Sequence, residues 1–323
     1  MAVLIVRNIE IEPNYYEELE PYLDKFGTYR IRDNKLQACS PFRYEKRPSF
    51  AVNLDNGSWI DSGATDDSMR KGHFTHLLAF LREETWFDTE DYLLDKYSTI
   101  ITDVDTLQLT YTLDTHTSYR VFTKEELSPY MWRVSYLTNR GISEKIQRAF
   151  QIGYDKDNKA VMIPWHDHKG NVINMKFRSI TQKKFWYHPE GQRIKHHVYG
   201  LHFIKKHNIK RVFAVESETD ALYLWTHGIP AIAFGGASMS KEQKLLLLRS
   251  PIEELVIATD NDAVGRRFAR TLADELMTHF DILRLEFPMC YKDMNDIPPT
   301  EIGSITERNI VNEGIYYVIN YCQ

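Results

Sequence analysis

The sequence predicts an α/β protein whose best-defined part is a mainly parallel, four-stranded sheet flanked by helices. Three observations support this fold class. Hydrophobic residues make up 43% of the 323 residues, short apolar segments alternate with helix-length segments over residues 211–287, and charge is segregated along the chain. Strands that alternate with helices imply right-handed crossovers and parallel pairing. At roughly 150 residues per domain, the length indicates about two domains, or three.

Each element over residues 211–287 has a local signal. Residues 211–215 (RVFAV) are typical of a buried strand, and the helix after it stops at Gly228 and Pro230. Ser240 is a suitable N-cap for the next helix, and Pro251 follows the end of that helix. The expected strands are 211–215, 231–234, 255–258 and 282–287, and the expected helices are 219–227, 241–249 and 264–279.

The composition excludes several classes of protein. A mean hydropathy of -0.44 and the absence of an apolar run near 18 residues argue against a membrane span. The apolar stretch at the N-terminus is too short for a signal peptide, so we expect a cytosolic protein, in the bacterial host if a phage encodes it. Cys39, Cys290 and Cys322 are too far apart to suggest a disulfide framework or a cysteine-rich zinc site.

Charge divides the chain into segments. The overall net charge of -5 argues against a generic polyanion binder, but residues 165–211 carry +9, residues 83–127 carry -8 and residues 212–297 carry -6. A net charge does not say where the charges lie, and these shifts predict domain boundaries. The acidic segment has a poor apolar period, which indicates a linker, and Ser128 and Pro129 mark a break after it.

Acidic residues follow the ends of the predicted parallel strands, where sites form in open α/β sheets. Glu216 follows the first strand, Asp220 lies one helical turn further on, Asp260 and Asp262 follow the third strand, and Asp293 follows the fourth. Unbalanced carboxylates would repel one another, and a hard divalent cation such as Mg²⁺ (or Mn²⁺) would resolve this. Each acid taken alone could simply cap a helix, but their joint position at one sheet edge favours a metal site.

These segments also resemble a known family. Residues 215–222 (VESETDAL), 227–229 (HGI), 234–236 (FGG) and 260–266 (DNDAVGR) resemble, in order and spacing, the Toprim domain shared by DnaG-type primases, topoisomerases and some nucleases. The match extends over about 85 residues, so it is far more specific than a single Asp-x-Asp. Ser217 stands where the family usually has a glycine after the first glutamate.

Upstream segments resemble the polymerase region of DnaG-type primases. The matching segments are 136–143 (YLTNRGIS), 150–154 (FQIGY), 162–165 with 170–179, 184–185, and 195–201. The resemblance implies a basic ridge that holds single-stranded template. Lysine and arginine bind phosphates and aromatic rings can stack on bases, which agrees with this implication. We expect Arg178, Lys184 and Lys195 to contact phosphate, and Phe177, Phe185, Trp186 and Tyr187 to be available for stacking.

The N-terminal region resembles the zinc-binding module of the same primases, in a degenerate form. Residues 39–52, 57–63 and 74–78 carry the match. The family has a histidine where Arg43 stands and a cysteine pair near residues 59–63, so Cys39 is the one ligand kept. A structural zinc needs four N or S ligands, so no zinc is expected. The predicted module is instead stabilised by packing of Phe42, Phe50, Trp59 and Phe74.

The resemblance implies an enzyme, a nucleotidyltransferase that makes RNA primers on single-stranded DNA from ribonucleoside triphosphates. Asp260, Asp262 and either Asp220 or Asp293 would hold two metal ions, and Glu216 would be a ligand or a proton acceptor. Lys292 and Asn295 would bind phosphate or support the acids. The predicted divisions are a degenerate zinc-binding-like module (1–97), an acidic linker (98–130), a basic subdomain (131–205), the Toprim domain (206–297) and a tail (298–323).

Two other functions use the same features. A Toprim nuclease would employ the same acids with water as the nucleophile, although the polymerase-like segment argues against it. A non-catalytic protein that binds single-stranded DNA would need the basic segment but not the acids. The chain leaves no room for a C-terminal helicase-binding domain, which together with the lost zinc ligands suggests a phage or mobile-element protein. A replicative helicase remains an expected partner, and a membrane does not.

Overall fold

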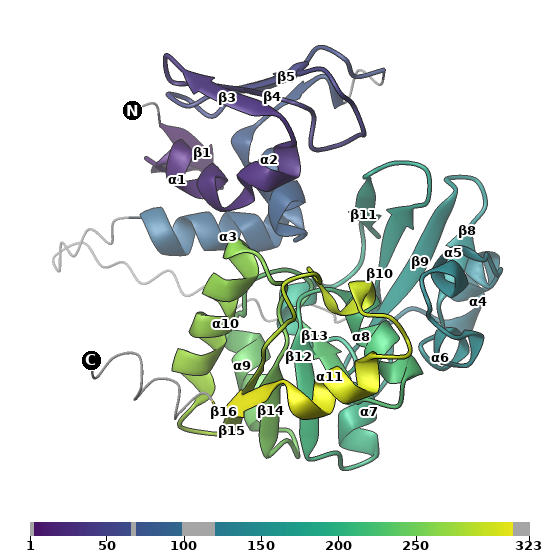
Figure 1. Ribbon diagram of the computed structural model, residues 1–323. Coiled ribbons are helices and arrows are strands. Elements are labelled where there is room, and N and C mark those ends of the chain that lie inside the picture. The colour runs from purple at the N-terminus through teal and green to yellow at the C-terminus, as the bar shows by residue number, and fades with distance from the viewer. Residues whose placement is uncertain (1–2, 66–68, 99–119, 313–323) are drawn as a thin grey trace, which may run out of the picture. The chain divides into compact units, whose positions relative to one another are not determined.

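The computed structural model describes residues 3–65, 69–98 and 120–312, and the chain divides into two compact units (Figure 1). The N-terminal unit comprises Met1–Leu81 with Thr85–Arg120, and the C-terminal unit comprises Arg82–Glu84 with Val121–Gln323. Most of the predicted acidic linker, residues 99–119, and the end of the predicted tail, residues 313–323, lie outside the described residues. None of the described helices is long and apolar enough to cross a membrane.

The N-terminal unit is a mixed α and β module. Its main sheet is antiparallel, with five strands in the order β3-β4-β5-β6-β7, and a separate two-stranded sheet pairs β1 with β2. The strands are β1 (Leu4–Val6), β2 (Ile9–Ile11), β3 (Tyr29–Arg32), β4 (Lys35–Ala38), β5 (Phe50–Asn53), β6 (Trp59–Asp61) and β7 (Lys71–Gly72), and the helices are α1 (Tyr15–Leu19), the 3₁₀ helix η1 (Glu20–Phe26), α2 (Phe74–Arg82) and α3 (Trp86–Tyr97).

Aromatic rings form the core of this unit. Phe42 lies 5.3 Å from Trp59 and 5.8 Å from Phe50 between ring centroids, and Phe50 lies 5.5 Å from Trp59. Phe74 is also buried and packs edge-on against Tyr15 at 4.8 Å between ring centroids. Aromatic pairs of this geometry contribute beyond the area that they bury, and buried aliphatic side chains such as Leu36, Val52 and Leu77 complete the core.

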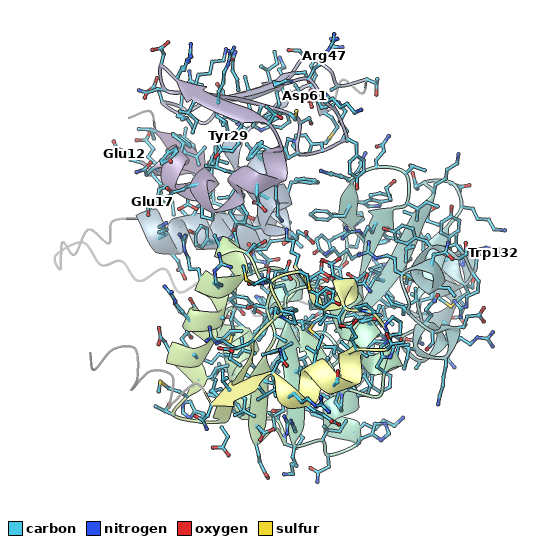
Figure 2. All side chains as sticks on the ribbon, in the orientation of Figure 1. Glu12, Glu17, Tyr29, Arg47, Asp61 and Trp132 are labelled. Atoms are coloured by element: carbon cyan, nitrogen blue, oxygen red, sulfur yellow. The ribbon has the colours of Figure 1, made fainter. Side chains whose placement is uncertain are left out.

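An ion-pair network surrounds Arg43 in the N-terminal unit. The guanidinium of Arg43 donates to Asp61, to Glu45 at 2.6 Å and to Ser49 at 2.6 Å. Asp61, which is labelled in Figure 2, is fully buried. Burial alone would raise the pKa of Asp61, but the hydrogen bond from Arg43 lowers it below its usual value. In the described ranges, no three His, Cys, Asp or Glu side chains form a ready metal site.

Replacement of Arg43 tests whether this network stabilises the N-terminal unit. We expect Arg43→Met to lower the free energy of unfolding by about 3 kcal/mol, because it leaves the buried Asp61 carboxylate without its cation. The control is Arg30→Met, in which an exposed arginine loses only its hydrogen bond to Gln37. Urea unfolding followed by tryptophan fluorescence measures both, and equal losses in the two variants would contradict the role of Arg43.

The C-terminal unit contains two sheets. The first is antiparallel, in the order β11-β10-β9-β8, and the second has the order β13-β12-β14-β15-β16. The strands are β8 (Gly153–Asp155), β9 (Ala160–His166), β10 (Val172–Ser179), β11 (Phe185–Tyr187), β12 (Arg211–Val215), β13 (Ala231–Ala233), β14 (Glu254–Ile257), β15 (Asp281–Leu285) and β16 (Ile310–Asn312).

Short helices connect these strands. They are α4 (Lys124–Leu127), the 3₁₀ helix η4 (Ser128–Tyr130), α5 (Tyr136–Asn139), α6 (Glu144–Ala149), η5 (Ile194–His196), α7 (Leu201–Lys206), α8 (Glu218–Thr226), α9 (Lys241–Leu248), α10 (Ala263–Leu276), η6 (Met294–Asp296) and α11 (Ile302–Arg308). The N-caps of α8, α9 and α10 are Ser217, Ser240 and Asp262, whose side chains accept a backbone N–H in the first turn.

The second sheet confirms the predicted α/β class and adds one strand to it. Strands β12, β13, β14 and β15 are parallel, as expected, and β16 pairs antiparallel with β15. Alternate residues of β12 enter different cores: Phe213 and Val215 pack with α8 and α11, whereas Val212 and Ala214 pack with α9 and α10. Helices therefore cover both faces of this sheet, which explains why the sequences of its central strands are continuously apolar.

The basic segment 165–211 is more buried than the sequence suggested. Strands β9 and β10 are almost entirely buried, and Phe177 is 3% exposed and stacks on Trp186 at 5.5 Å. The expectation that Phe177 is available to stack on bases is therefore wrong, because its ring fills the core beside β9. Phe185, Trp186 and Tyr187 of β11 are partly exposed.

The buried His166 and its partly buried neighbour His202 make this unit sensitive to acid. The rings of His166 and His202 lie 4.5 Å apart. Burial and the neighbouring His202 lower the pKa of His166 to about 3, and burial lowers the pKa of His202 to about 4. A histidine with a depressed pKa in the folded state takes up its proton more readily on unfolding. Its stabilising contribution is complete above about pH 6.5 and is lost as the pH falls below that value.

We expect the free energy of unfolding to fall more steeply between pH 6.5 and 5 in the parent chain than in a His166→Gln variant. The difference in the fall should be about 2 kcal/mol, from the proton taken up on unfolding. His168→Gln is the control, because His168 is exposed. Urea titrations at several pH values measure the slopes, and parallel slopes for the parent and His166→Gln would refute the assignment.

Candidate functional site

The parallel register of β12 and β14 brings the predicted acids together. Ala214 pairs with Ile257, so Glu216 and Asp260 lie just beyond the carboxyl ends of neighbouring strands. The amide of Asp260 donates to Glu216 Oε1 at 3.2 Å. A Cβ at Gly265 would collide with the Asp260 carbonyl oxygen and approach Glu216 Oε1, so glycine there permits the two acids to meet.

The other three acids lie around this pair. Asp262 caps α10 by accepting from the Gly265 amide at 2.9 Å, which is the capping role considered for it from the sequence. Asp220 on α8 is buried and accepts from Ser217 Oγ at 2.5 Å. Asp293 caps η6 by accepting from the Asp296 amide at 2.9 Å. The capping bonds occupy one carboxylate oxygen of Asp262 and of Asp293.

Three of these acids, Asp220, Asp260 and Asp293, have a raised pKa. Burial raises the pKa of Asp260 to about 10, with added repulsion from Glu216 and then Asp220. Burial and the charge of Asp293 raise the pKa of Asp220 to about 7, and burial also raises the pKa of Asp293. These directions show a carboxylate group whose negative charge is not balanced by the protein alone.

The donor set fits a hard divalent cation. Carboxylate oxygens are the ligands that Mg²⁺ prefers, and the unbalanced charge is what such a cation would neutralise. Among the described residues, no three His, Cys, Asp or Glu side chains are already arranged to hold a metal ion. The agreement with a divalent cation therefore rests on the type of ligand atoms and on their charge. The cation would be held by the side chains that follow the carboxyl ends of β12 and β14, namely Glu216, Asp260 and Asp262.

Arg140 is a residue of this site that the sequence did not single out. Its Nε donates to Asn295 Oδ1 at 2.9 Å, and Asn295 Nδ2 donates back to the Arg140 carbonyl at 2.8 Å. The backbone amide of Asn295 donates to Asp220 at 3.2 Å. The positive charge of Arg140 also lowers the pKa of Asp220 and of Asp293, against the stronger effects that raise them. The segment 136–143 was noted for its resemblance, but only the fold brings Arg140 to the acids.

The predicted cations occupy different positions. Lys292 Nζ lies 3.3 Å from Asp262 Oδ2 and is half exposed, so it accompanies the acids. Lys184 lies between β10 and β11, with its Nζ 6.0 Å from the centroid of the Trp186 ring. Arg178 on β10 is partly buried, and the charge of Glu83 contributes to raising its pKa against the effect of burial.

Lys195 departs most from its predicted role. It is 6% exposed, and its Nζ donates to Ser238 Oγ at 2.9 Å and to the Ser238 carbonyl at 3.0 Å. Its Nζ also lies 3.3 Å from the Glu84 carboxylate. Protein oxygens therefore take the positions that a phosphate would need, and the predicted contact with phosphate is closed in this conformation.

Comparison with known proteins agrees with this geometry. The family model described as Toprim-like matches residues 213–297, the segment that contains all five acids. The DNA primase of Clostridium acetobutylicum is 28% identical to this chain over 312 residues, which cover 81% of this chain and 50% of that protein. The DNA primase of Legionella pneumophila is 23% identical, with 82% and 53% covered. The chain is a relative of the DnaG-type DNA primases.

The likeness to the primases extends to the fold. The crystal structure of the zinc-binding and RNA polymerase domains of the Aquifex aeolicus primase matches with a TM-score of 0.51 at 18% identity. The match covers 96% of this chain and 87% of that one. The chain spans about half the length of the bacterial primases that it matches in sequence. The shared features are therefore the Toprim-like domain and the fold around it.

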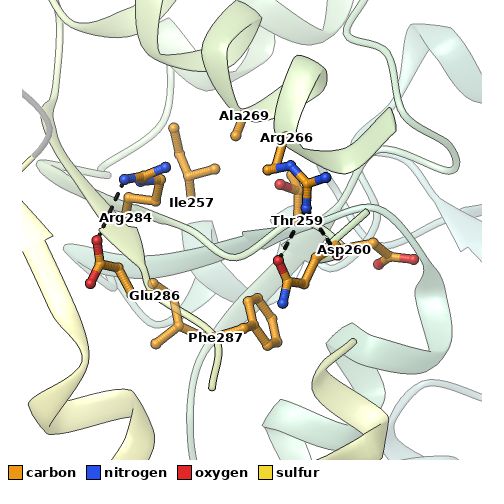
Figure 3. Close-up of a pocket in the computed structure, with 10 residues that line it drawn as sticks. Ile257, Thr259, Asp260, Arg266, Ala269, Arg284, Glu286 and Phe287 are labelled. Atoms are coloured by element: carbon orange, nitrogen blue, oxygen red, sulfur yellow. Dashed lines mark hydrogen bonds and ion pairs between the residues drawn. The ribbon is translucent and has the colours of Figure 1, made fainter. Parts of the chain in front are cut away.

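A pocket of the Toprim-like domain adjoins Asp260. It has a volume of about 280 Å³, near the lower end for small-molecule sites. Figure 3 shows the side chains of Arg266 and Arg284 around it, and Arg284 lies 3.6 Å from Glu286. Phe287, expected at the end of a strand, lies beyond β15 and contributes its ring to the wall. The remaining lining residues are Ile257, Thr259, Asn261, Ala269 and Leu285.

The balance of charge among the acids is testable without any assay of activity. We expect Mg²⁺ at millimolar concentration to raise the thermal unfolding temperature, because the cation binds the folded acids. Asp260→Asn should raise that temperature in the absence of Mg²⁺, since the folded state no longer has to keep a buried acid protonated beside other acids, and it should abolish the further increase with Mg²⁺. Asp281→Asn, at the opposite end of β15, is the control. A Mg²⁺ response in Asp260→Asn equal to that of the control would contradict the site.

Proposed function

We propose that this chain synthesises RNA primers on single-stranded DNA by metal-dependent nucleotidyl transfer. The observation that carries the proposal is the convergence of Glu216, Asp260 and Asp262 at the ends of β12 and β14 in a domain that matches the Toprim-like model. The primases that it resembles in sequence support the choice of reaction. We assign the activity, substrates and partners of those primases to this chain only as part of this proposal.

The proposed reaction joins two ribonucleotides opposite a template. The 3′-hydroxyl oxygen of one attacks the α-phosphorus of a ribonucleoside triphosphate, the bond from that phosphorus to the bridging oxygen breaks, and pyrophosphate leaves. When bound, two Mg²⁺ or Mn²⁺ ions would lower the pKa of the hydroxyl and neutralise the leaving group. The hydroxyl proton would pass to water or to a carboxylate such as Glu216, whose alternative role is that of a metal ligand.

The residues of the chain position the reactants. Asp260 and Asp262 hold the metal-binding oxygens on a rigid turn, because the cap of α10 orients Asp262. Arg140 and Asn295 orient Asp220 through the amide bond of Asn295. Lys292, half exposed beside Asp262, is placed to meet a phosphate oxygen. The pocket beside Asp260 could accept one base or sugar, given its volume of about 280 Å³ and the ring of Phe287.

Single-stranded DNA, ribonucleotides and Mg²⁺ test the proposal directly. We expect the parent chain to produce short labelled RNA, and Asp260→Ala or Asp262→Ala to reduce the yield at least about a hundredfold, since each removes a ligand of the transition-state metals. Asp281→Ala is the control. Shortening of the template instead of RNA synthesis would identify a Toprim nuclease, and normal synthesis by the Asp260 and Asp262 variants would refute the site.

A further inference from the structure

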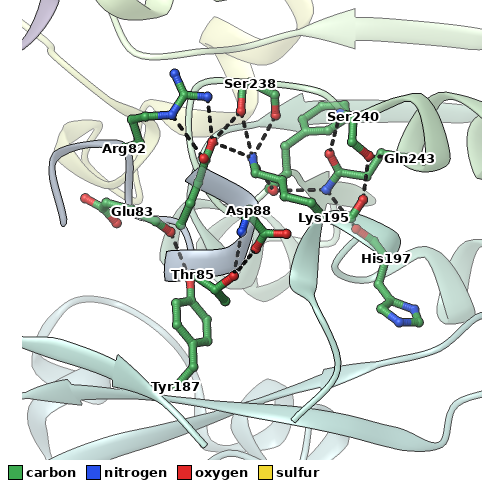
Figure 4. Close-up of polar contacts among 12 residues, drawn as sticks. Arg82, Glu83, Thr85, Asp88, Tyr187, Lys195, His197, Ser238, Ser240 and Gln243 are labelled. Carbon is green, nitrogen blue, oxygen red and sulfur yellow. Dashed lines mark hydrogen bonds and ion pairs between the residues drawn. The ribbon is translucent and has the colours of Figure 1, made fainter. Parts of the chain in front are cut away.

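A short acidic segment of the chain covers the buried lysines of the C-terminal unit. Residues Arg82–Glu84 belong to this unit, although the residues on both sides of them belong to the N-terminal unit. Figure 4 shows the side chain of Arg82 near Ser238, and the ammonium group of Lys195 hydrogen-bonded to Ser238. We name residues 82–84 the acidic strap. With one arginine and two glutamates, the strap carries a net negative charge.

Glu84 is the most enclosed residue of the strap. It is 4% exposed, and its carboxylate accepts from Arg82 at 2.9 and 3.0 Å and from Ser238 Oγ at 2.6 Å. Lys195 Nζ lies 3.3 Å away. Burial would raise the pKa of Glu84, but Arg82 and Lys195 outweigh it and lower the pKa to about 2. A charged carboxylate therefore fills a cradle made of a lysine, a hydroxyl and an arginine.

Glu83 makes a second, weaker contact of the same kind. Its Oε2 lies 3.5 Å from Lys176 Nζ, and its carbonyl accepts from the Tyr187 hydroxyl at 2.9 Å. Lys176 is 1% exposed and also pairs with Glu218 at 3.0 Å. Lys176 Nζ lies 5.1 Å from the centroid of the Phe185 ring, at the face of β11. The strap thus supplies a carboxylate to each of two buried lysines.

The loop beneath the strap connects it to the acidic cluster. Gly236 has a φ of 135°, and a Cβ there would collide with the carbonyl oxygen of Arg82. The amides of Gly235 and Gly236 both donate to the carbonyl of Glu216, at 3.0 and 3.1 Å. The strap therefore rests on the same loop that holds the backbone of Glu216. A phosphate bound in place of the strap carboxylates would lie beside the proposed metal site.

We propose that Lys176, Lys195 and Ser238 form a phosphate-binding site that the acidic strap occupies as an intramolecular competitor. The strap must leave before a phosphate of a template or of a ribonucleotide can bind. Lysines and hydroxyls are phosphate ligands, and a carboxylate is the anion that the protein can place there itself. A buried ion pair adds little net stability, so stability alone does not account for enclosing these lysines with carboxylates. The inference rests on the proposed function and assigns a means of regulating its site.

A matched pair of double variants tests the competition. Glu83→Gln with Glu84→Gln removes the charge of the strap, and Glu253→Gln with Glu254→Gln makes the same change in two adjacent glutamates that pair with Lys210 and Arg211 at the opposite end of β12 and β14. Fluorescence anisotropy measures the affinity for a labelled oligothymidylate without Mg²⁺ or ribonucleotides. We expect the strap variant to bind at least about tenfold more tightly than the control, with a steeper salt dependence for each phosphate gained.

A second arm distinguishes the source of the phosphate. The same variants are titrated with a fluorescent analogue of ATP. Tighter binding of the oligothymidylate alone assigns the site to template, tighter binding of the analogue alone assigns it to the nucleotide, and either result supports the proposal. Equal affinities of the strap variant and the control for both probes would overturn it. If the double variant fails to fold, Glu83→Gln alone replaces it, since that side chain is 30% exposed.

The parent chain provides a test that needs no substitution. Arg82 is 10% exposed on its side chain, so trypsin should cleave slowly after it in the free protein. If ligand displaces the strap, saturating oligothymidylate or ATP should accelerate this cleavage several-fold. Unchanged or slower cleavage with both ligands would show that the strap is a fixed structural contact. Neither measurement requires RNA synthesis, so a chain that makes no primers can still confirm the strap while the proposed function fails.

Discussion

The constraint on which the C-terminal unit depends is the parallel pairing of β12 with β14. This register puts Glu216 and Asp260 close enough for the amide of Asp260 to bond to the Glu216 carboxylate. Carboxylates held this near one another cost free energy, which appears as the raised pKa of Asp260 and Asp220. The two apolar cores on the faces of the sheet compensate by burying β12 and β14 on both sides.

Several contacts in the rest of the unit hold these acids near one another. Gly265 lets the turn after β14 approach Glu216, and the cap of α10 holds Asp262 beside it. Arg140 and Asn295 bring a compensating positive charge and an amide from elements distant in sequence. The amides of Gly235 and Gly236 then fix the backbone of Glu216 from the other side. The charge of Arg140 offsets part of the repulsion, and the pKa of Asp260 and of Asp220 nevertheless stays raised.

Charge is balanced differently in the two units. In the N-terminal unit, Arg43 neutralises the buried Asp61 completely enough to keep the pKa of Asp61 low. The guanidinium of Arg43 thus supplies the positive charge beside this buried carboxylate. In the C-terminal unit, the carboxylate of Glu84 similarly balances the positive charge of the buried Lys195. After β12 and β14, by contrast, burial and repulsion from neighbouring acids outweigh the nearby positive charges and raise the pKa of Asp260 and Asp220.

The amino-acid sequence alone determined the α/β class, the order of the strands and helices from residue 211 to 285, and the candidate acids. These follow from local apolar patterns, from caps such as Ser240 and from the rule that parallel strands end at one edge. Strand β16, the burial of Phe177, the enclosure of Lys195 and the position of Arg140 were decided by tertiary structure. Each depends on contacts between segments far apart in the chain, and a local pattern of hydrophobicity or charge contains no information about which distant carboxylate or ring will meet a given side chain.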